Sequence, residues 1–84
     1  MPTPNFLLRQ AFYEAIENDE LSLGQALKRM RKIAGKTQPE FAKFVDVAPR
    51  IITDIERGVA NPTIETLNKI GRAFGLVAGF QRVS

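Results

Sequence analysis

The chain has 84 residues, of which 12 are Lys or Arg and 9 are Asp or Glu, giving a formal net charge of +3. It contains neither cysteine nor histidine, which excludes disulfides and thiolate metal sites and removes the commonest general base. No apolar run approaches the ~20 residues of a membrane span, and no signal-peptide pattern opens the chain. We therefore expect one small cytoplasmic domain with no cofactor, a size at which oligomerisation is a natural source of extra stability.

The charge is distributed unevenly along the chain. Residues 1–22 hold one basic and four acidic side chains, whereas residues 23–84 hold eleven basic and five acidic ones. A basic surplus is typical of a surface that binds phosphate. Many solvated helices are also basic, so charge alone is weak support for nucleic-acid binding.

Residues 6–18 form the first predicted helix, after a proline-containing end at residues 1–5. Its apolar face consists of Leu8, Phe12, Ala15 and Ile16. We favour the interpretation that this helix enlarges the core of the domain; the alternative is a surface for a partner protein. The acidic end at residues 17–20 disfavours contact with DNA.

A capping box formed by Ser22 and Gln25 predicts a second helix over residues 23–34, which Gly35 ends. The side of this helix predicted to be buried is Leu23, Leu27, Met30 and Ala34. Arg31 lies next to this apolar stripe.

Residues 37–58 predict two short helices around a tight turn. Thr37 and Glu40 form a second capping box, and Pro39 occupies the first turn, where a missing N–H costs little. Asp46 is expected at the turn, because Asp tolerates the left-handed conformation that a helix exit often needs.

The second short helix is predicted to begin at Pro49, whose φ is already set, and to end at Gly58. The apolar residues that would pack the two helices together are Phe41, Ala42, Val45, Ile52 and Ile55. The small Ala42 lets the second helix cross the first closely. This spacing predicts a helix-turn-helix whose second helix enters a DNA major groove; an ordinary helical hairpin that binds nothing is the alternative.

After a short loop at residues 59–62, Thr63 is predicted to cap another helix, with Glu65 near its positive end. Gly75 ends this helix. Its predicted core face is Ile64, Leu67, Ile70 and Phe74.

Residues 76–83 contain two β-branched residues and an aromatic residue without helical periodicity, which predicts a strand. A lone strand leaves backbone groups unpaired, so we expect it to pair with its copy in a homodimer as an antiparallel ribbon. The predicted dimerisation residues are Leu76, Val77, Ala78, Gly79 and Phe80.

The motif resembles the Cro/lambda-repressor-type (XRE) helix-turn-helix family over about residues 23–75. The matching residues are Thr37-Gln38-x-Glu40-Phe41-Ala42, Val47, Ile52, Ile55-Glu56-Arg57-Gly58, Asn61-Pro62-Thr63 and Leu67-x-x-Ile70. The chain departs from the family at Asp46, where Gly is usual, and at Pro49, where Gln or a similar base reader is frequent.

The resemblance implies a mainly α, lambda-repressor-like helix-turn-helix bundle, here with an extra N-terminal helix and a C-terminal β-strand. The domains would be residues 1–22 for the tail and extra helix, 23–75 for DNA binding, and 76–84 for dimerisation. An Arg at the position of Arg31 pairs in the family with the Glu at the position of Glu56; a solvated Arg31 is the alternative.

The start of the second motif helix should point at base edges. Arg50 is the best reader, since Arg makes bidentate bonds to guanine, and Asp54 can either accept from a cytosine amine or repel phosphate. Gln38 should meet a phosphate at a helix N-terminus. The predicted DNA-contacting residues are Lys36, Thr37, Gln38, Lys43, Pro49, Arg50, Ile51, Thr53, Asp54, Arg57 and Asn61. With one strong base reader, DNA shape should carry much of the specificity.

The leading functional hypothesis is a homodimeric, sequence-specific DNA-binding repressor on a palindromic operator. A strand after the last family helix resembles the HipB-like antitoxin branch, whereas many lambda-type domains continue with another helix. That branch implies an antitoxin that represses its own operon, a HipA-like serine/threonine kinase as toxin partner, and a place at the bacterial nucleoid. A protein-interaction module and a plain phage-type repressor are the alternatives. The sequence contains no nucleophile–base pair, metal cluster or phosphate loop, so we do not expect an enzyme.

Overall fold

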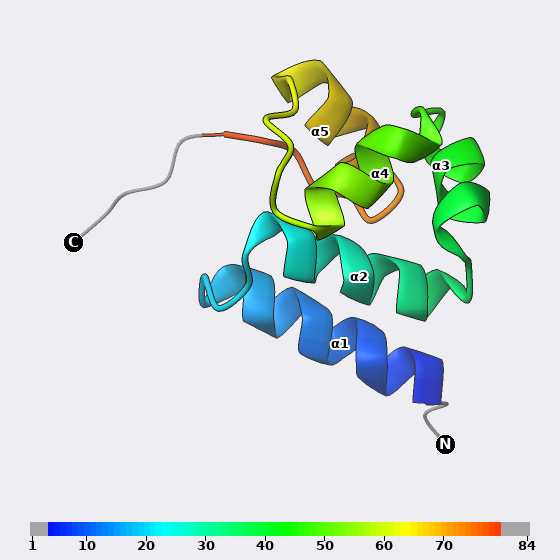
Figure 1. Cartoon of the computed structure of the whole chain (residues 1–84). Coiled ribbons are helices and arrows are strands. Elements are labelled where there is room, and N and C mark those ends of the chain that lie inside the picture. The colour runs from blue at the N-terminus through cyan, green and yellow to red at the C-terminus, as the bar shows by residue number, and fades with distance from the viewer. Residues whose placement is uncertain (1–3, 80–84) are drawn as a thin grey trace.

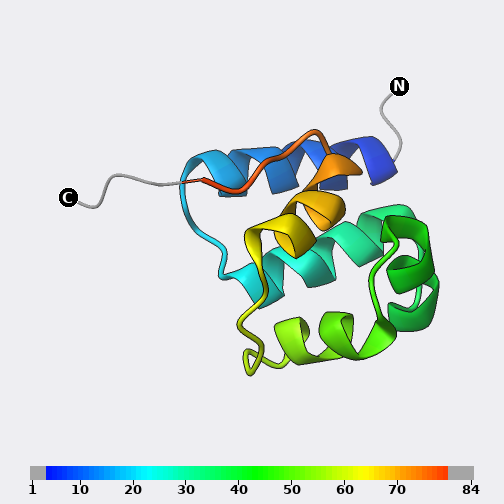
Figure 2. The same ribbon diagram turned by 90° about the horizontal axis from the view of Figure 1, so that it is seen from above.

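The computed structural model describes residues 4–79, and this part of the chain forms five α-helices (Figure 1). The helices are α1 (Pro4–Glu17), α2 (Leu23–Ala34), α3 (Gln38–Val45), α4 (Pro49–Glu56) and α5 (Ile64–Arg72). Both views place α2 in the middle of the molecule, with α1 on one side of it and α4 on the other (Figures 1 and 2). The predicted mainly helical bundle is confirmed.

The helix ends follow local sequence signals. The Thr37 hydroxyl accepts a hydrogen bond from the Glu40 N–H, and the Glu40 carboxylate accepts one from the Thr37 N–H. The Ser22–Gln25 box has the same reciprocal bonds. Asp46 ends α3 in the left-handed conformation, with φ 59° and ψ 50°. Both predicted capping boxes and the left-handed turn residue are therefore confirmed.

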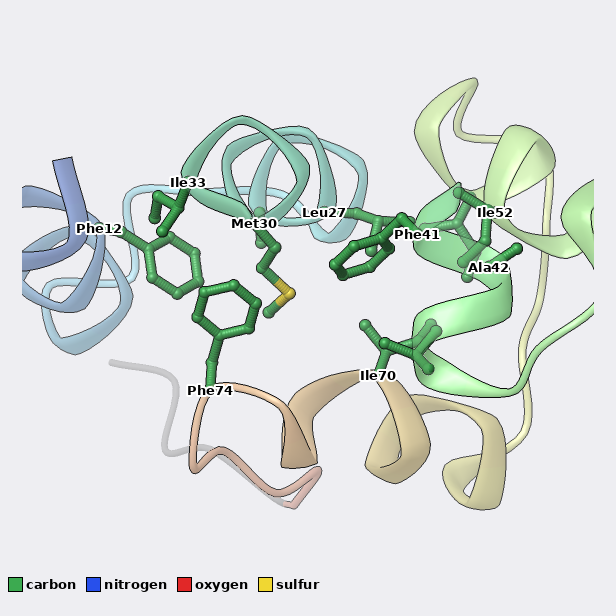
Figure 3. Packing of buried hydrophobic residues seen from close by; sticks show 12 residues of the cluster. Phe12, Leu27, Met30, Ile33, Phe41, Ala42, Ile52, Ile70 and Phe74 are labelled. Atoms are coloured by element: carbon green, nitrogen blue, oxygen red, sulfur yellow. The ribbon is translucent and has the colours of Figure 1, made fainter. Parts of the chain in front are cut away.

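The hydrophobic core draws residues from all five helices and from the turn after α5 (Figure 3). It comprises Phe12, Ala26, Leu27, Met30, Ile33, Phe41, Ala42, Val45, Ile52, Ile55, Ile70 and Phe74. Phe12 of α1 is fully buried, and its ring centroid lies 5.7 Å from that of Phe74 in an edge-on arrangement. The neighbouring Tyr13 hydroxyl donates to the Phe74 carbonyl at 2.7 Å. The interpretation that α1 enlarges the core is confirmed.

Several residues predicted to face the core are exposed. Leu8, Leu23 and Ile64 are 40%, 46% and 67% exposed. The buried side of α2 is centred on Ala26 and Ile33 as well as Leu27 and Met30, because α2 packs against α1 and α4 at once. Ile64 lies in the first turn of α5, before that helix reaches the core.

The strand prediction is wrong for residues 76–79, and Phe80 lies outside the described residues. The Leu76 N–H donates to the Gly71 carbonyl at 2.9 Å, and the Ala78 N–H donates to the Asn68 side-chain oxygen at 2.7 Å. These bonds attach the segment to α5. The backbone N–H groups of Leu76 and Ala78 are therefore already occupied within the chain.

Gly24 allows α2 to pass close to the C-terminal end of α4. A Cβ atom at this position would lie 2.7 Å from the Ile55 carbonyl oxygen. Because that oxygen belongs to the backbone and cannot rotate away, Gly24→Ala should lower the free energy of unfolding by about 1–3 kcal/mol in a urea titration. Gly79→Ala is the control, since its added Cβ would meet nothing within 4 Å. An unfolding midpoint for Gly24→Ala equal to that of the wild type would contradict this close approach.

Candidate nucleic-acid interface

Helix α4 has one side packed in the core and an outer side that is accessible to solvent. Ile52 and Ile55 are 0% and 2% exposed and hold the helix in place. Pro49, Arg50 and Arg57 are exposed on the outer side. Ile51, Thr53 and Asp54 are half-buried between these two groups. The predicted reading residues therefore lie along one accessible helix face.

A buried ion pair behind this surface links α2, α3 and α4. The Glu56 carboxylate accepts hydrogen bonds from Arg31 Nε at 2.5 Å and Arg31 Nη2 at 2.9 Å, a bidentate arrangement. It also accepts one from Gln38 Nε2 at 3.2 Å. Arg31 Nη1 donates to the Lys36 carbonyl at 3.2 Å, which attaches the loop before α3. The network fixes the orientation of α4 relative to its neighbours.

The ion pair stays charged near neutral pH. The Glu56 side chain is 2% exposed and that of Arg31 24%. Burial by itself would raise the pKa of Glu56, but hydrogen bonds from Arg31 and Gln38, together with the Arg31 charge, outweigh it and hold this pKa below its usual range. The hydrogen bond to Glu56 likewise raises the pKa of Arg31.

Gln38 and Thr53, both predicted to contact DNA, are bonded to each other. The Thr53 hydroxyl lies 3.1 Å from Gln38 Oε1 and 3.2 Å from the Pro49 carbonyl, and its single proton can serve only one of them at a time. Gln38 thus connects the start of α3 to the middle of α4. Sequence reasoning missed this role of Gln38. The signal that could have indicated it is Glu56, because a buried carboxylate needs more hydrogen-bond donors than Arg31 alone supplies.

Arg50 and Asp54 form a weak ion pair on the outer side of α4. Arg50 Nε lies 3.8 Å from the Asp54 carboxylate, and the two side chains are 92% and 31% exposed. An exposed ion pair one helical turn apart contributes little to stability, so the Arg50 side chain can leave it for another partner at small cost. Asp54 reduces the positive charge of this face in the absence of DNA.

The remaining predicted contacts lie at the start of α3, at its end, and after α4. Lys36 Nζ lies 5.0 Å from the centre of the Phe44 ring, and the Thr37 hydroxyl is occupied by its cap. Lys43 is exposed in the last turn of α3. Asn61 is exposed in the loop beyond α4 and lines a shallow hollow with Ile51.

Within residues 4–79, no group of His, Cys, Asp or Glu side chains could hold a metal ion. The helices of this described part are all too short or too polar to cross a membrane.

Two short helices joined by a tight turn, the second with an accessible outer face, define a helix-turn-helix protein. The helix-turn-helix family model matches residues 27–78, and the chain belongs to this family, of the XRE type. The predicted family is confirmed; the HipB-like branch is not identified by this match.

Two groups of relatives are similar to most of the chain. Endothelial differentiation-related factor 1 of Rattus norvegicus is 37% identical over 65 residues, which cover 75% of this chain and 44% of that protein. Multiprotein-bridging factor 1 of Candida albicans is 36% identical over 62 residues, covering 74% and 41%. The chain therefore spans less than half the length of these relatives. No solved structure matches it.

Proposed function

We propose that the chain is a sequence-specific DNA-binding regulatory module that places α4 in the major groove. The observation that carries this proposal is the position of Arg50, which is 92% exposed on a helix whose other side is held in the core. A reader on a rigid element loses little freedom on binding, which favours specificity. Membership of the helix-turn-helix family supports the same function.

In this proposal the other predicted residues have distinct roles. Lys36 and the backbone N–H of Gln38 contact a phosphate, because the N–H groups of Thr37 and Glu40 are already used by the capping box. Pro49 and Ile51 offer apolar contact to a thymine methyl. Gln38 orients α4 through Thr53 and Glu56, whether or not it also reaches the DNA backbone. The chain acts by binding, and we assign it no catalytic step.

We assign the chain neither of the narrower roles of repressor and antitoxin. The antitoxin hypothesis and its HipA-like partner were based on the terminal strand, and residues 76–79 do not form one. The predicted homodimer depended on the same strand, so we assign no operator symmetry. The relatives named above come from Rattus norvegicus and Candida albicans, and they give no reason to place the chain at a bacterial nucleoid.

Arg50→Ala tests the reading helix. The preferred duplex is first selected from random sequences, and binding is then followed by fluorescence anisotropy across a salt series. Arg50→Ala should lose about 1–3 kcal/mol of binding free energy and relax the preference at one base pair. Lys43→Ala should instead weaken binding to all sequences alike and reduce the salt slope by about 1. If Arg50→Ala keeps both affinity and preference, α4 does not read DNA.

A protein-interaction module is the second candidate function. Multiprotein-bridging factor 1 is by its name a protein that bridges other proteins, and the similarity to it covers 74% of this chain. The two functions are compatible, because α1 and α4 lie on opposite sides of α2 (Figures 1 and 2). Binding of DNA by α4 would leave the α1 side of the molecule accessible.

A further inference from the structure

Three cations form a ridge along the outer side of α2. Lys28, Arg29 and Lys32, the basic ridge, are all exposed. No carboxylate of the described residues lies within ion-pair distance of any of them. Their like charges repel one another in the isolated chain, and a partner with negative charge would remove this repulsion.

One apolar side chain, that of Leu8, lies beside the basic ridge. Leu8 of α1 and the three ridge residues line an open groove of about 410 Å³, the α1–α2 groove. Leu8 is 40% exposed and Leu7 is 56% exposed, whereas Phe12, one turn further along α1, is fully buried. The start of α1 therefore exposes apolar surface that the fold of residues 4–79 does not use.

From this combination we infer that the α1–α2 groove binds an acidic amphipathic helix of a partner protein. The apolar face of such a helix would cover Leu8, and the carboxylates flanking that face would neutralise the ridge. A nucleic-acid backbone would pair with the ridge but would offer no apolar contact to the Leu8 side chain. Charge and apolar exposure together thus favour an acidic protein segment over phosphate.

This inference rests on the second candidate function, protein interaction, and is independent of DNA reading by α4. α1, which contributes Leu8 to the groove, lies across α2 from the reading helix α4 (Figures 1 and 2). Lys28 also lines the hollow where α2 meets the end of α4, so it is not used as a test position. Arg29 and Lys32 line only the α1–α2 groove among the hollows described.

The probe is a synthetic, fluorescein-labelled peptide of about four helical turns, with leucines at i, i+3, i+4 and i+7 spacing and glutamates on either side of them. Its control has the same composition in an order that spreads the leucines around the helix. Anisotropy titrations at low salt use the full chain. We expect saturable binding of the amphipathic peptide and about tenfold weaker binding of the control.

Arg29→Glu/Lys32→Glu should weaken peptide binding about tenfold or more, and Leu8→Asn should also weaken it. The matched control is Lys69→Glu/Arg72→Glu, which makes the same charge change at the same spacing on α5. Circular dichroism confirms that each variant is folded. Amide NMR shifts caused by the peptide should be confined to α1 and the second half of α2.

Four results would overturn the inference: no saturable binding, equal binding of the control peptide, equal losses in the two double variants, or displacement of the peptide by duplex DNA. Arg50→Ala should bind the peptide like the wild type, and Arg29→Glu/Lys32→Glu should retain the sequence preference for DNA. These two variants therefore test peptide binding by the α1–α2 groove and DNA binding by α4 independently of each other.

Discussion

Glu56→Ala should lower the free energy of unfolding by about 3–5 kcal/mol, because it leaves the Arg31 guanidinium partly buried without a counter-charge. It also removes the acceptor of Gln38 Nε2, whose hydrogen bond to Glu56 is 3.2 Å long. Arg31 is 24% exposed, and the water that reaches it places the expected loss near the lower end of the range. The measurement is a urea titration followed by far-ultraviolet circular dichroism.

Two further variants show whether the unpaired Arg31 charge causes the loss of stability in Glu56→Ala. Glu14→Ala removes an exposed carboxylate from α1 and should change the stability by less than about 0.5 kcal/mol. Arg31→Met/Glu56→Leu removes both charges and should restore much of the lost stability, because no buried charge remains unpaired. Equal unfolding midpoints for Glu56→Ala and the wild type would show that the pair is exposed or absent in solution.

The pH dependence of the stability of Glu56→Gln, compared with that of the wild type, should also reveal the Arg31–Glu56 ion pair. Since the pKa of Glu56 is lowered in the folded chain, its charge contributes fully to stability above the unfolded pKa of about 4.3. The contribution is lost as the pH falls through the folded pKa. The stability difference between wild type and Glu56→Gln should therefore shrink on acidification, as measured by thermal unfolding. The pKa of Glu40, lowered by its bond from the Thr37 backbone, is shared by both proteins and cancels. A difference that is constant with pH contradicts the ion pair.

Phe12→Ala should cost about 3–5 kcal/mol of unfolding free energy, because it leaves a cavity between α1 and the end of α5. Phe12 is fully buried, and its ring centroid lies 5.7 Å from that of Phe74 and 5.6 Å from that of Tyr13. Figure 3 shows the Phe12 side chain next to that of Phe74, and their rings meet edge-on. The variant thus measures how firmly α1 is attached to the helix-turn-helix.

Phe44→Ala is the matched control for Phe12→Ala. It removes the same ring from a side chain that is 55% exposed, so it should cost less than about 1 kcal/mol. Urea unfolding of both variants makes the comparison. Similar losses in the two variants would show that α1 is detached from the core in solution, and the α1–α2 groove would then not be a stable surface.

Most helix boundaries were predictable from the sequence because local interactions determine them; the exception is the end of α5, predicted at Gly75 and found at Arg72. The capping boxes join residues three positions apart, and Pro49 begins α4 through its own restricted φ. The left-handed turn at Asp46 depends on a residue type that tolerates it. The spacing of Ile52 and Ile55 from Ala42 then sufficed to predict the helix-turn-helix and the burial of these residues.

The sequence did not determine the features that depend on distant residues. Gly24 matters because the Ile55 carbonyl lies against it, and Gln38 acquires its role from the buried Glu56. The buried side of α2 depends on two neighbouring helices, so a single apolar stripe predicted only part of it. The segment after α5 has strand-like composition, but composition does not show which acceptors a backbone N–H will find. In the folded chain the Asn68 side-chain oxygen accepts a hydrogen bond from the Ala78 N–H, and this contact between residues ten positions apart joins the segment to α5.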